Sequence, residues 1–112
     1  MIYNIDDSNF KEFTDANKEK NIIIDFYTNR CGFCKLEDVI FQSLSQSVKK
    51  SKTVIAKCDC DKSENLVEKF VIQSLPTVII LKGDKVISKL EGIVNEEKIL
   101  KQITDYSQKR NS

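Results

Sequence analysis

The stretch that decides the fold is residues 22–35, IIIDFYTNRCGFCK. Its first half is a run of strand-forming residues, apolar on both faces, which is typical of a buried parallel strand. One charge, Asp25, interrupts that run, and a buried carboxylate is costly unless it has a partner or a function. Two cysteines separated by two residues, Cys31 and Cys34, follow the strand directly. The carboxylate and the thiols together indicate a chemical site.

Length and composition indicate one ordinary domain. The chain has 112 residues, 40% hydrophobic and 31% charged, which suffices for one core and not for two. Its net charge of +1 gives no electrostatic basis for binding nucleic acid or an anionic membrane. No apolar run reaches the roughly 18 residues that span a bilayer, and residues 1–9 lack the pattern of a secretory signal peptide. We therefore expect a cytoplasmic protein, in a reducing compartment.

Alternating patterns along the chain predict an α/β fold with a mixed sheet. Strands are expected at 3–5, 22–27, 53–59, 77–81 and 85–90, and helices near 8–18, 34–49, 62–70 and 96–106. The early alternation implies parallel crossovers, and the late hairpin around Gly83 and Asp84 implies an antiparallel edge. We expect one domain over residues 1–106 and a frayed tail at 107–112.

Helix faces and caps can also be predicted. The helix after the cysteines has an apolar stripe that should face the core, formed by Leu36, Ile40, Leu44 and Val48 with Val39 beside them. Asp7 or Ser8 is expected to cap the first helix. Asp61 with Glu64 resembles a capping box at the start of the third helix.

The spacing of the cysteine pair suits redox chemistry. Cys31 and Cys34 stand at i and i+3 where a strand passes into a helix, so their thiols can alternate between dithiol and disulfide. Free N–H groups at the helix N-terminus favour thiolate, as do the charges of Arg30 and Lys35. We expect Cys31, the more exposed sulfur, to be the nucleophile and Cys34 to be the resolving thiol.

Two other interpretations of the pair are half a zinc site and an inert disulfide. The chain has no histidine, so zinc would need Cys58 and Cys60, whose one-residue spacing departs from the usual knuckle. Both lie on a predicted strand, where they should be small buried hydrophobes and where a second redox pair would be strained. We therefore favour a redox pair, with no metal and no bound cofactor.

Taken together, the motifs resemble the thioredoxin family. The resemblance is carried by residues 24–27 ahead of the cysteines, residues 31–35, the segment 75–77 (LPT) and Gly92 beyond the hairpin, in matching order over about residues 1–106. It implies the thioredoxin fold, a central mixed five-stranded sheet flanked by four helices. It also implies dithiol–disulfide exchange with protein substrates.

The resemblance implies roles for further residues. Asp25 matches a buried carboxylate that relays a proton to or from the resolving thiol, and desolvation would raise its pKa toward neutrality. An ion pair with Lys57 on the neighbouring strand is the alternative, and Lys57 could also modulate the relay. Although X–Pro bonds are mostly trans, Pro76 matches a cis proline that faces the disulfide. The backbone of Leu75 would pair with the substrate, and Gly92 would serve backbone geometry and substrate approach.

Two positions beside the cysteines depart from the family. Arg30 stands where tryptophan is usual and Phe33 where proline is usual, while Gly32 lies between the cysteines. Arg30 adds a charge beside Cys31, and Phe33 restores a backbone N–H near the sulfurs. Both should stabilise the reduced form and make the disulfide more oxidising, unless they are merely solvated neighbours.

The sequence thus predicts a protein-disulfide oxidoreductase, most readily one that reduces protein disulfides as a monomer. It has no nicotinamide or flavin motif, so an external reductase or a small thiol would have to recharge it. Two alternatives remain: a more oxidising oxidase or isomerase, and a thioredoxin-fold interaction module without turnover.

Overall fold

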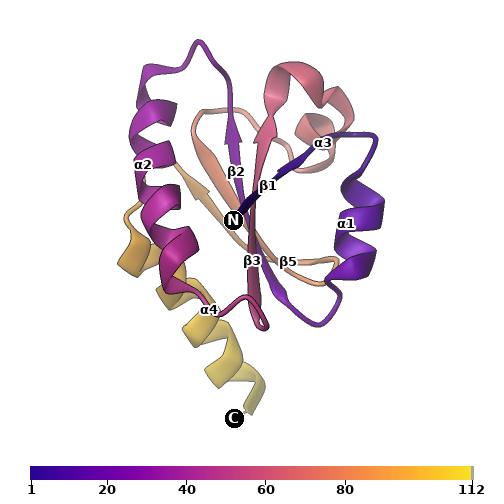
Figure 1. The fold of residues 1–112 in the computed structure, drawn as a ribbon, viewed down its shortest axis with the longest axis vertical. Coiled ribbons are helices and arrows are strands. Elements are labelled where there is room, and N and C mark those ends of the chain that lie inside the picture. Colours follow the sequence, from indigo (N-terminus) through magenta and orange to yellow (C-terminus); the bar gives the residue numbers. More distant parts are fainter. Residues whose placement is uncertain (112) are drawn as a thin grey trace.

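A computed structural model describes residues 1–111, in which helices cover both faces of a central sheet (Figure 1). The strands are β1 (Ile2–Ile5), β2 (Asn21–Tyr27), β3 (Thr53–Asp59), β4 (Thr77–Lys82) and β5 (Lys85–Glu91). The helices are α1 (Phe10–Ala16), α2 (Gly32–Ser47), the short 3-10 helix η1 (Cys60–Lys62), α3 (Glu64–Lys69) and α4 (Glu96–Asn111).

The strand β2 lies at the centre of the sheet. The strand order is β1-β3-β2-β4-β5, with β1, β3 and β2 parallel and with β4 and β5 antiparallel to their neighbours. Residues of β2 therefore have strands on both sides, and Asp25 lies opposite Lys57 of β3 and Val78 of β4. The prediction of a mixed five-stranded α/β sheet with four helices is confirmed.

Alternation along β2 divides the interior into two cores. Ile22, Ile24 and Phe26 pack in the core that α1 and α3 cover. Ile23 packs in the opposite core, beneath α2 and α4, with Phe41 of α2 among its neighbours. Figure 1 shows these two helix pairs on opposite faces of the sheet. Because side chains alternate in a strand, Asp25 faces the same side as Ile23, beneath α2.

The predicted inward face of α2 is partly wrong. Leu36 and Val39 are 54% and 67% exposed, whereas the buried face of the helix consists of Cys34, Glu37, Phe41 and Leu44. Successive members of that set are three, four and three residues apart, so they all lie on one face of the helix. Residues exactly four apart, as in the predicted stripe, move gradually around the helix. Hydropathy alone could not include Glu37, because a carboxylate is normally placed outside.

The predicted caps also differ from the observed ones. Asp7 does not cap α1; its carboxylate oxygens accept hydrogen bonds from the backbone N–H groups of Asn65 and Leu66, at 3.0 and 2.9 Å, in the first turn of α3. A carboxylate there satisfies free N–H groups and complements the helix dipole. Asp61 lies in η1 instead of capping α3. The capping box fails because β3 ends at Asp59 and a 3-10 turn intervenes.

The C-terminal helix is longer than predicted. α4 extends through Asn111, so residues 107–111 are helical where a frayed tail was expected, and Ser112 lies outside the described residues. Lys109 and Arg110 in the last turn suit the negative end of the helix dipole. Asn95 caps the start of α4, because its side-chain oxygen accepts the Lys98 N–H at 2.8 Å. The domain boundary at residue 106 stays a prediction.

Val71, two residues after the last residue of α3, has a backbone conformation that valine disfavours. Its φ is +52°, in the left-handed region. The Val71 N–H donates to the Glu68 carbonyl and the Ile72 N–H donates to the Val67 carbonyl, at 3.2 and 2.9 Å. These two bonds form a Schellman motif, whose left-handed residue is usually glycine. The valine side chain is 55% exposed, so it contributes little packing in return.

Replacing Val71 with glycine should therefore raise the free energy of unfolding by about 1 kcal/mol, since the left-handed conformation costs an L-residue roughly 1–2 kcal/mol. Urea unfolding at neutral pH would measure the change. The control Val71→Ala retains a Cβ and should gain less. An alanine variant as stable as the glycine variant would contradict this explanation.

Candidate active site

The cysteine pair occupies the first turn of α2. Cys31 is the N-cap, with extended backbone, and Cys34 lies one turn further, 4% exposed. The two form a disulfide with their Cα atoms 5.3 Å apart, and the Cys34 N–H donates to Cys31 Sγ at 3.1 Å. An amide donor and the helix dipole both favour a thiolate at Cys31 once the disulfide opens. Cys31 is also the more exposed sulfur, as expected.

Asp25 is a buried carboxylate beneath this turn. The residue is 2% exposed, and its Oδ1 has no hydrogen-bond partner among residues 1–111. The pKa of Asp25 is raised from 3.8 to about 7, chiefly by burial and also by the charges of Glu37 and Asp38, whereas Lys57 lowers it. A carboxyl group with this pKa can give or take a proton near neutral pH.

Lys57 pairs with a carboxylate other than Asp25. Its Nζ lies 3.9 Å from Asp38 Oδ1 and 5.1 Å from the centre of the Tyr27 ring. Lys57 is the strand neighbour of Asp25, as expected, but it makes no ion pair with Asp25 in the described structure. Its charge therefore acts on Asp25 at longer range, as a modulator.

A pocket of about 190 Å³ connects these groups. Its lining includes Asp25, Cys34, Asp38 and Lys57, so the resolving cysteine and the carboxylate open into one space. Water in that space could carry a proton between them. Sequence reasoning missed Asp38; its place four residues after Cys34, one helical turn away, was the available signal.

The turn before β4 and the residue after β5 are hydrogen-bonded to each other, and β4 begins next to the end of β2. The Leu75–Pro76 peptide bond is cis, as the resemblance implied. The Gly92 N–H donates to the Pro76 carbonyl at 2.9 Å. Gly92 has φ +85°, and a Cβ built there would have no atom within 4 Å. Glycine is thus required by the backbone conformation, and the space beside it is open.

Arg30 and Phe33 are both at the surface. The Arg30 guanidinium binds the Asp61 carboxylate at 2.8 Å and is 80% exposed, so part of its charge is compensated away from Cys31. Sequence reasoning missed this partner because 31 residues separate the two. Phe33 is 64% exposed, and the Gly32 position is open. The apolar ring beside the cysteines is therefore accessible to another molecule.

Cys58 and Cys60 are unpaired. Cys58 is buried in β3, as expected, but Cys60 lies in η1 and is half-buried, so the prediction that both lie on one strand is wrong. Burial is the main cause that raises the pKa of Cys58 to about 11 and that of Cys60 to about 12. Thiols with such pKa values are weak nucleophiles at neutral pH. Within residues 1–111, no group of three or more potential ligands could hold a metal ion.

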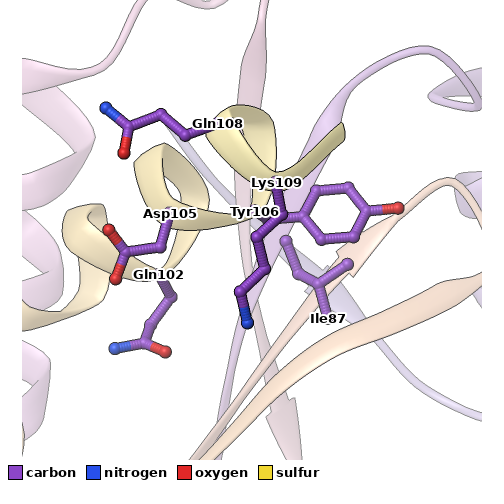
Figure 2. Close-up of a pocket in the computed structure, with 6 residues that line it drawn as sticks. All are labelled: Ile87, Gln102, Asp105, Tyr106, Gln108 and Lys109. Atoms are coloured by element: carbon purple, nitrogen blue, oxygen red, sulfur yellow. The ribbon is translucent and has the colours of Figure 1, made fainter. Parts of the chain in front are cut away.

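A larger hollow, of about 440 Å³, lies between α4 and β5 (Figure 2). Its lining is mostly polar and belongs to the C-terminal half of α4, with Ile87 of β5 below. The C-terminus of α4 lies at the opposite end of the molecule from the β2–α2 junction that carries the cysteines (Figure 1). This hollow therefore has no part in the cysteine chemistry.

A redox-active cysteine pair on a helix N-terminus shares a pocket with a buried carboxylate, and a cis proline precedes the strand that pairs with β2. This combination defines a dithiol–disulfide exchange site. The thioredoxin family model matches residues 1–105. A thioredoxin of Chlorobaculum thiosulfatiphilum is 31% identical over 101 residues, 89% of this chain and 91% of that protein. Thioredoxin-1 of Caenorhabditis elegans is 33% identical over 100 residues, 87% of this chain and 85% of that one.

Solved structures agree. The thioredoxin of Fasciola hepatica superposes with a TM-score of 0.81 at 25% identity, covering 94% of this chain and 98% of that one. The chain belongs to the thioredoxin family. It is a dithiol–disulfide oxidoreductase, like the members of that family. Thioredoxins act on disulfides in proteins, are recharged by a reductase and generally need no cofactor. No helix within residues 1–111 is long and apolar enough to cross a membrane.

The raised pKa of Asp25 makes stability depend on pH. The folded pKa of about 7 lies above the ordinary 3.8, so the unfolded chain ionises first and the free energy of unfolding falls as pH rises from about 4 to about 7. Asp25→Asn removes this loss. The difference in free energy of unfolding between the variant and the wild type should therefore increase, in favour of the variant, by on the order of 4 kcal/mol from pH 4 to pH 8.

Urea unfolding of the oxidised proteins at both pH values would test this. The half-exposed neighbour Asp38, changed to asparagine, is the matched control and should change the pH dependence much less, because burial is the main cause of the raised Asp25 pKa. Parallel stability curves for wild type and Asp25→Asn would contradict the raised pKa.

Proposed function

We propose that the chain reduces disulfides in other proteins, with Cys31 as the nucleophile, Cys34 as the resolving thiol and Asp25 as the proton relay. The single observation that carries this proposal is the asymmetric burial of the pair. Cys31 is the accessible sulfur, whereas Cys34 is 4% exposed and shares a pocket with Asp25. Only Cys31 is placed to meet a bulky disulfide.

The exchange proceeds in two steps, formation of a mixed disulfide and its resolution. The Cys31 thiolate attacks one sulfur of the substrate disulfide; that S–S bond breaks, a mixed disulfide forms, and the departing sulfur takes up a proton. Asp25 then accepts the Cys34 proton, and the Cys34 thiolate attacks Cys31. The second substrate sulfur leaves as a thiolate and takes the proton that Asp25 accepted, so two electrons have passed to the substrate and Cys31–Cys34 is oxidised.

The substrate chain is proposed to lie against the backbone of Leu75, beside cis Pro76, and over the open space at Gly92. The cis Leu75–Pro76 bond and the absence of any atom within 4 Å of a Cβ built at Gly92 support this path. Phe33, largely exposed, would add apolar contact. One chain supplies all these groups, which supports a monomer as the working unit.

Recharging requires an external reductase or a small thiol, because the described residues include no second pair able to supply electrons. Cys58 and Cys60 are both free, and their raised pKa values disfavour the thiolate form at neutral pH. Two free thiols also support a reducing compartment such as the cytoplasm.

Trapping would test the assignment of the two cysteines. Cys34→Ser should accumulate a mixed disulfide with insulin, because attack by Cys31 remains and resolution is lost; Cys31→Ser should form none. Mass spectrometry of the adducts would measure both. The control Cys58→Ser with Cys60→Ser should reduce insulin at the wild-type rate. An adduct on Cys34 would reverse the roles, and no reduction by the wild type would favour a binding module without turnover.

A more oxidising oxidase or isomerase is the second candidate function, and Phe33 favours it. In the first turn of α2, Phe33 provides a backbone N–H that a proline would lack, and free N–H groups there stabilise a thiolate. Arg30 supports this function less, because its charge, which would stabilise a thiolate at Cys31, is paired with the carboxylate of Asp61.

Phe33→Pro should therefore lower the reduction potential of the Cys31–Cys34 couple by about 30 mV or more, which corresponds to roughly 1.4 kcal/mol. Titration in glutathione buffers would measure it. Phe33→Ala keeps the N–H and should shift the potential less. A wild-type potential near the thioredoxin value of about −270 mV supports a reductant, and one near about −180 mV supports an oxidase or isomerase. An equal shift in both variants would attribute the effect to the ring.

A further inference from the structure

Glu37 is a fully buried carboxylate on α2, three residues after Cys34. Its exposed fraction is 0%, and it lies on the same helical face as the core residues Phe41 and Leu44. Burial raises its pKa, and the described residues provide no partner for its Oε2. A hydrocarbon side chain would avoid both costs at this position. The polar contact that Glu37 makes through Oε1 therefore indicates its role.

That contact reaches a segment distant in the sequence. Glu37 Oε1 accepts the backbone N–H of Val94 at 2.8 Å, and Val94 is itself buried, 6% exposed. Val94 belongs to the connection between β5 and α4, 57 residues further along the chain. Water cannot readily replace the acceptor, because the bond is buried. Without the carboxylate, the Val94 N–H must remain unpaired or the segment must move.

The same segment is tied to the cis-proline turn. Two residues before Val94, the Gly92 N–H donates to the Pro76 carbonyl at 2.9 Å. The carboxylate of Glu91 accepts the Ser74 hydroxyl at 3.1 Å. Hydrogen bonds thus join the redox helix to residues 91–94, and residues 91–94 to the turn before β4. Glu37 provides the link to the redox helix.

We propose that Glu37 is a positioning residue for protein substrates: it fixes residues 92–94 against the redox helix, so that the substrate-binding backbone keeps its place relative to Cys31. This inference rests on the proposed path of the substrate over Leu75 and Gly92. A small disulfide reaches Cys31 without that backbone and should not depend on Glu37.

Two kinds of variant separate hydrogen bonding from charge. Glu37→Gln keeps an amide oxygen that can accept the Val94 N–H and removes the ionisable group. Glu37→Leu removes the acceptor, and Glu37→Met does the same with an unbranched side chain, in case leucine does not fit. Urea unfolding and near-UV circular dichroism would establish that each full-length variant is folded.

The test compares two substrates under single-turnover conditions, with each protein reduced beforehand. For insulin, Glu37→Leu or Glu37→Met should raise the half-saturating concentration about tenfold, the scale of one lost hydrogen bond, and change the maximal rate less than about twofold. For 2-hydroxyethyl disulfide, the rate should stay within about twofold of the wild type. Glu37→Gln should restore wild-type behaviour with insulin.

An equal loss with both substrates, or a wild-type half-saturating concentration in the apolar variants, would overturn the positioning role. A Gln variant as impaired as the Leu variant would also overturn it, since charge and not the hydrogen bond would then matter. If the wild type itself does not reduce insulin, the proposed function fails and this inference fails with it. Activity of the wild type distinguishes the two cases.

Discussion

Burial of β2 on both faces is the constraint on which the rest of the structure depends. The strand pairs with β3 on one side and β4 on the other, and helices cover both of its faces. A charge placed within such a strand cannot reach bulk water, so burial raises the pKa of Asp25 to about 7. The same burial fixes the end of the strand, and with it the N-terminus of α2 that carries Cys31 and Cys34.

The electrostatic environment around the cysteines is uneven. Asp25, Glu37 and Asp38 lie under or on the redox helix, and Lys57, in the pocket lining, has its Nζ 3.9 Å from Asp38 Oδ1. Carboxylates raise one another's pKa when they share a poorly solvated region. Cys34 faces this side, whereas Cys31 faces solvent and the amide donors of the helix N-terminus. This asymmetry supports the roles proposed for the two thiols, with Cys31 as the thiolate and Cys34 as the thiol that exchanges a proton with a neighbour.

Most of the fold could be predicted, because strand alternation and turn residues are local signals. The strands β2 and β3 and the hairpin at Gly83 appear within one residue of their expected positions. Three of the failures have a common cause, which is contact between residues far apart in the chain. Asp7 caps α3, Arg30 binds Asp61, and Glu37 is drawn into the core by Val94. No local pattern contains these partners.

The sequence alone determined the cysteine spacing, the misplaced charge in the central strand and the order of elements, and these suffice for the fold and the class of chemistry. The tertiary structure alone decided which carboxylates surround Asp25, where the charge of Lys57 and Arg30 is compensated, and which segments border the disulfide. The physical reason is that pKa values and hydrogen-bond partners depend on distance and burial in space. Both are set by strand register and helix packing, which bring together residues that the chain separates.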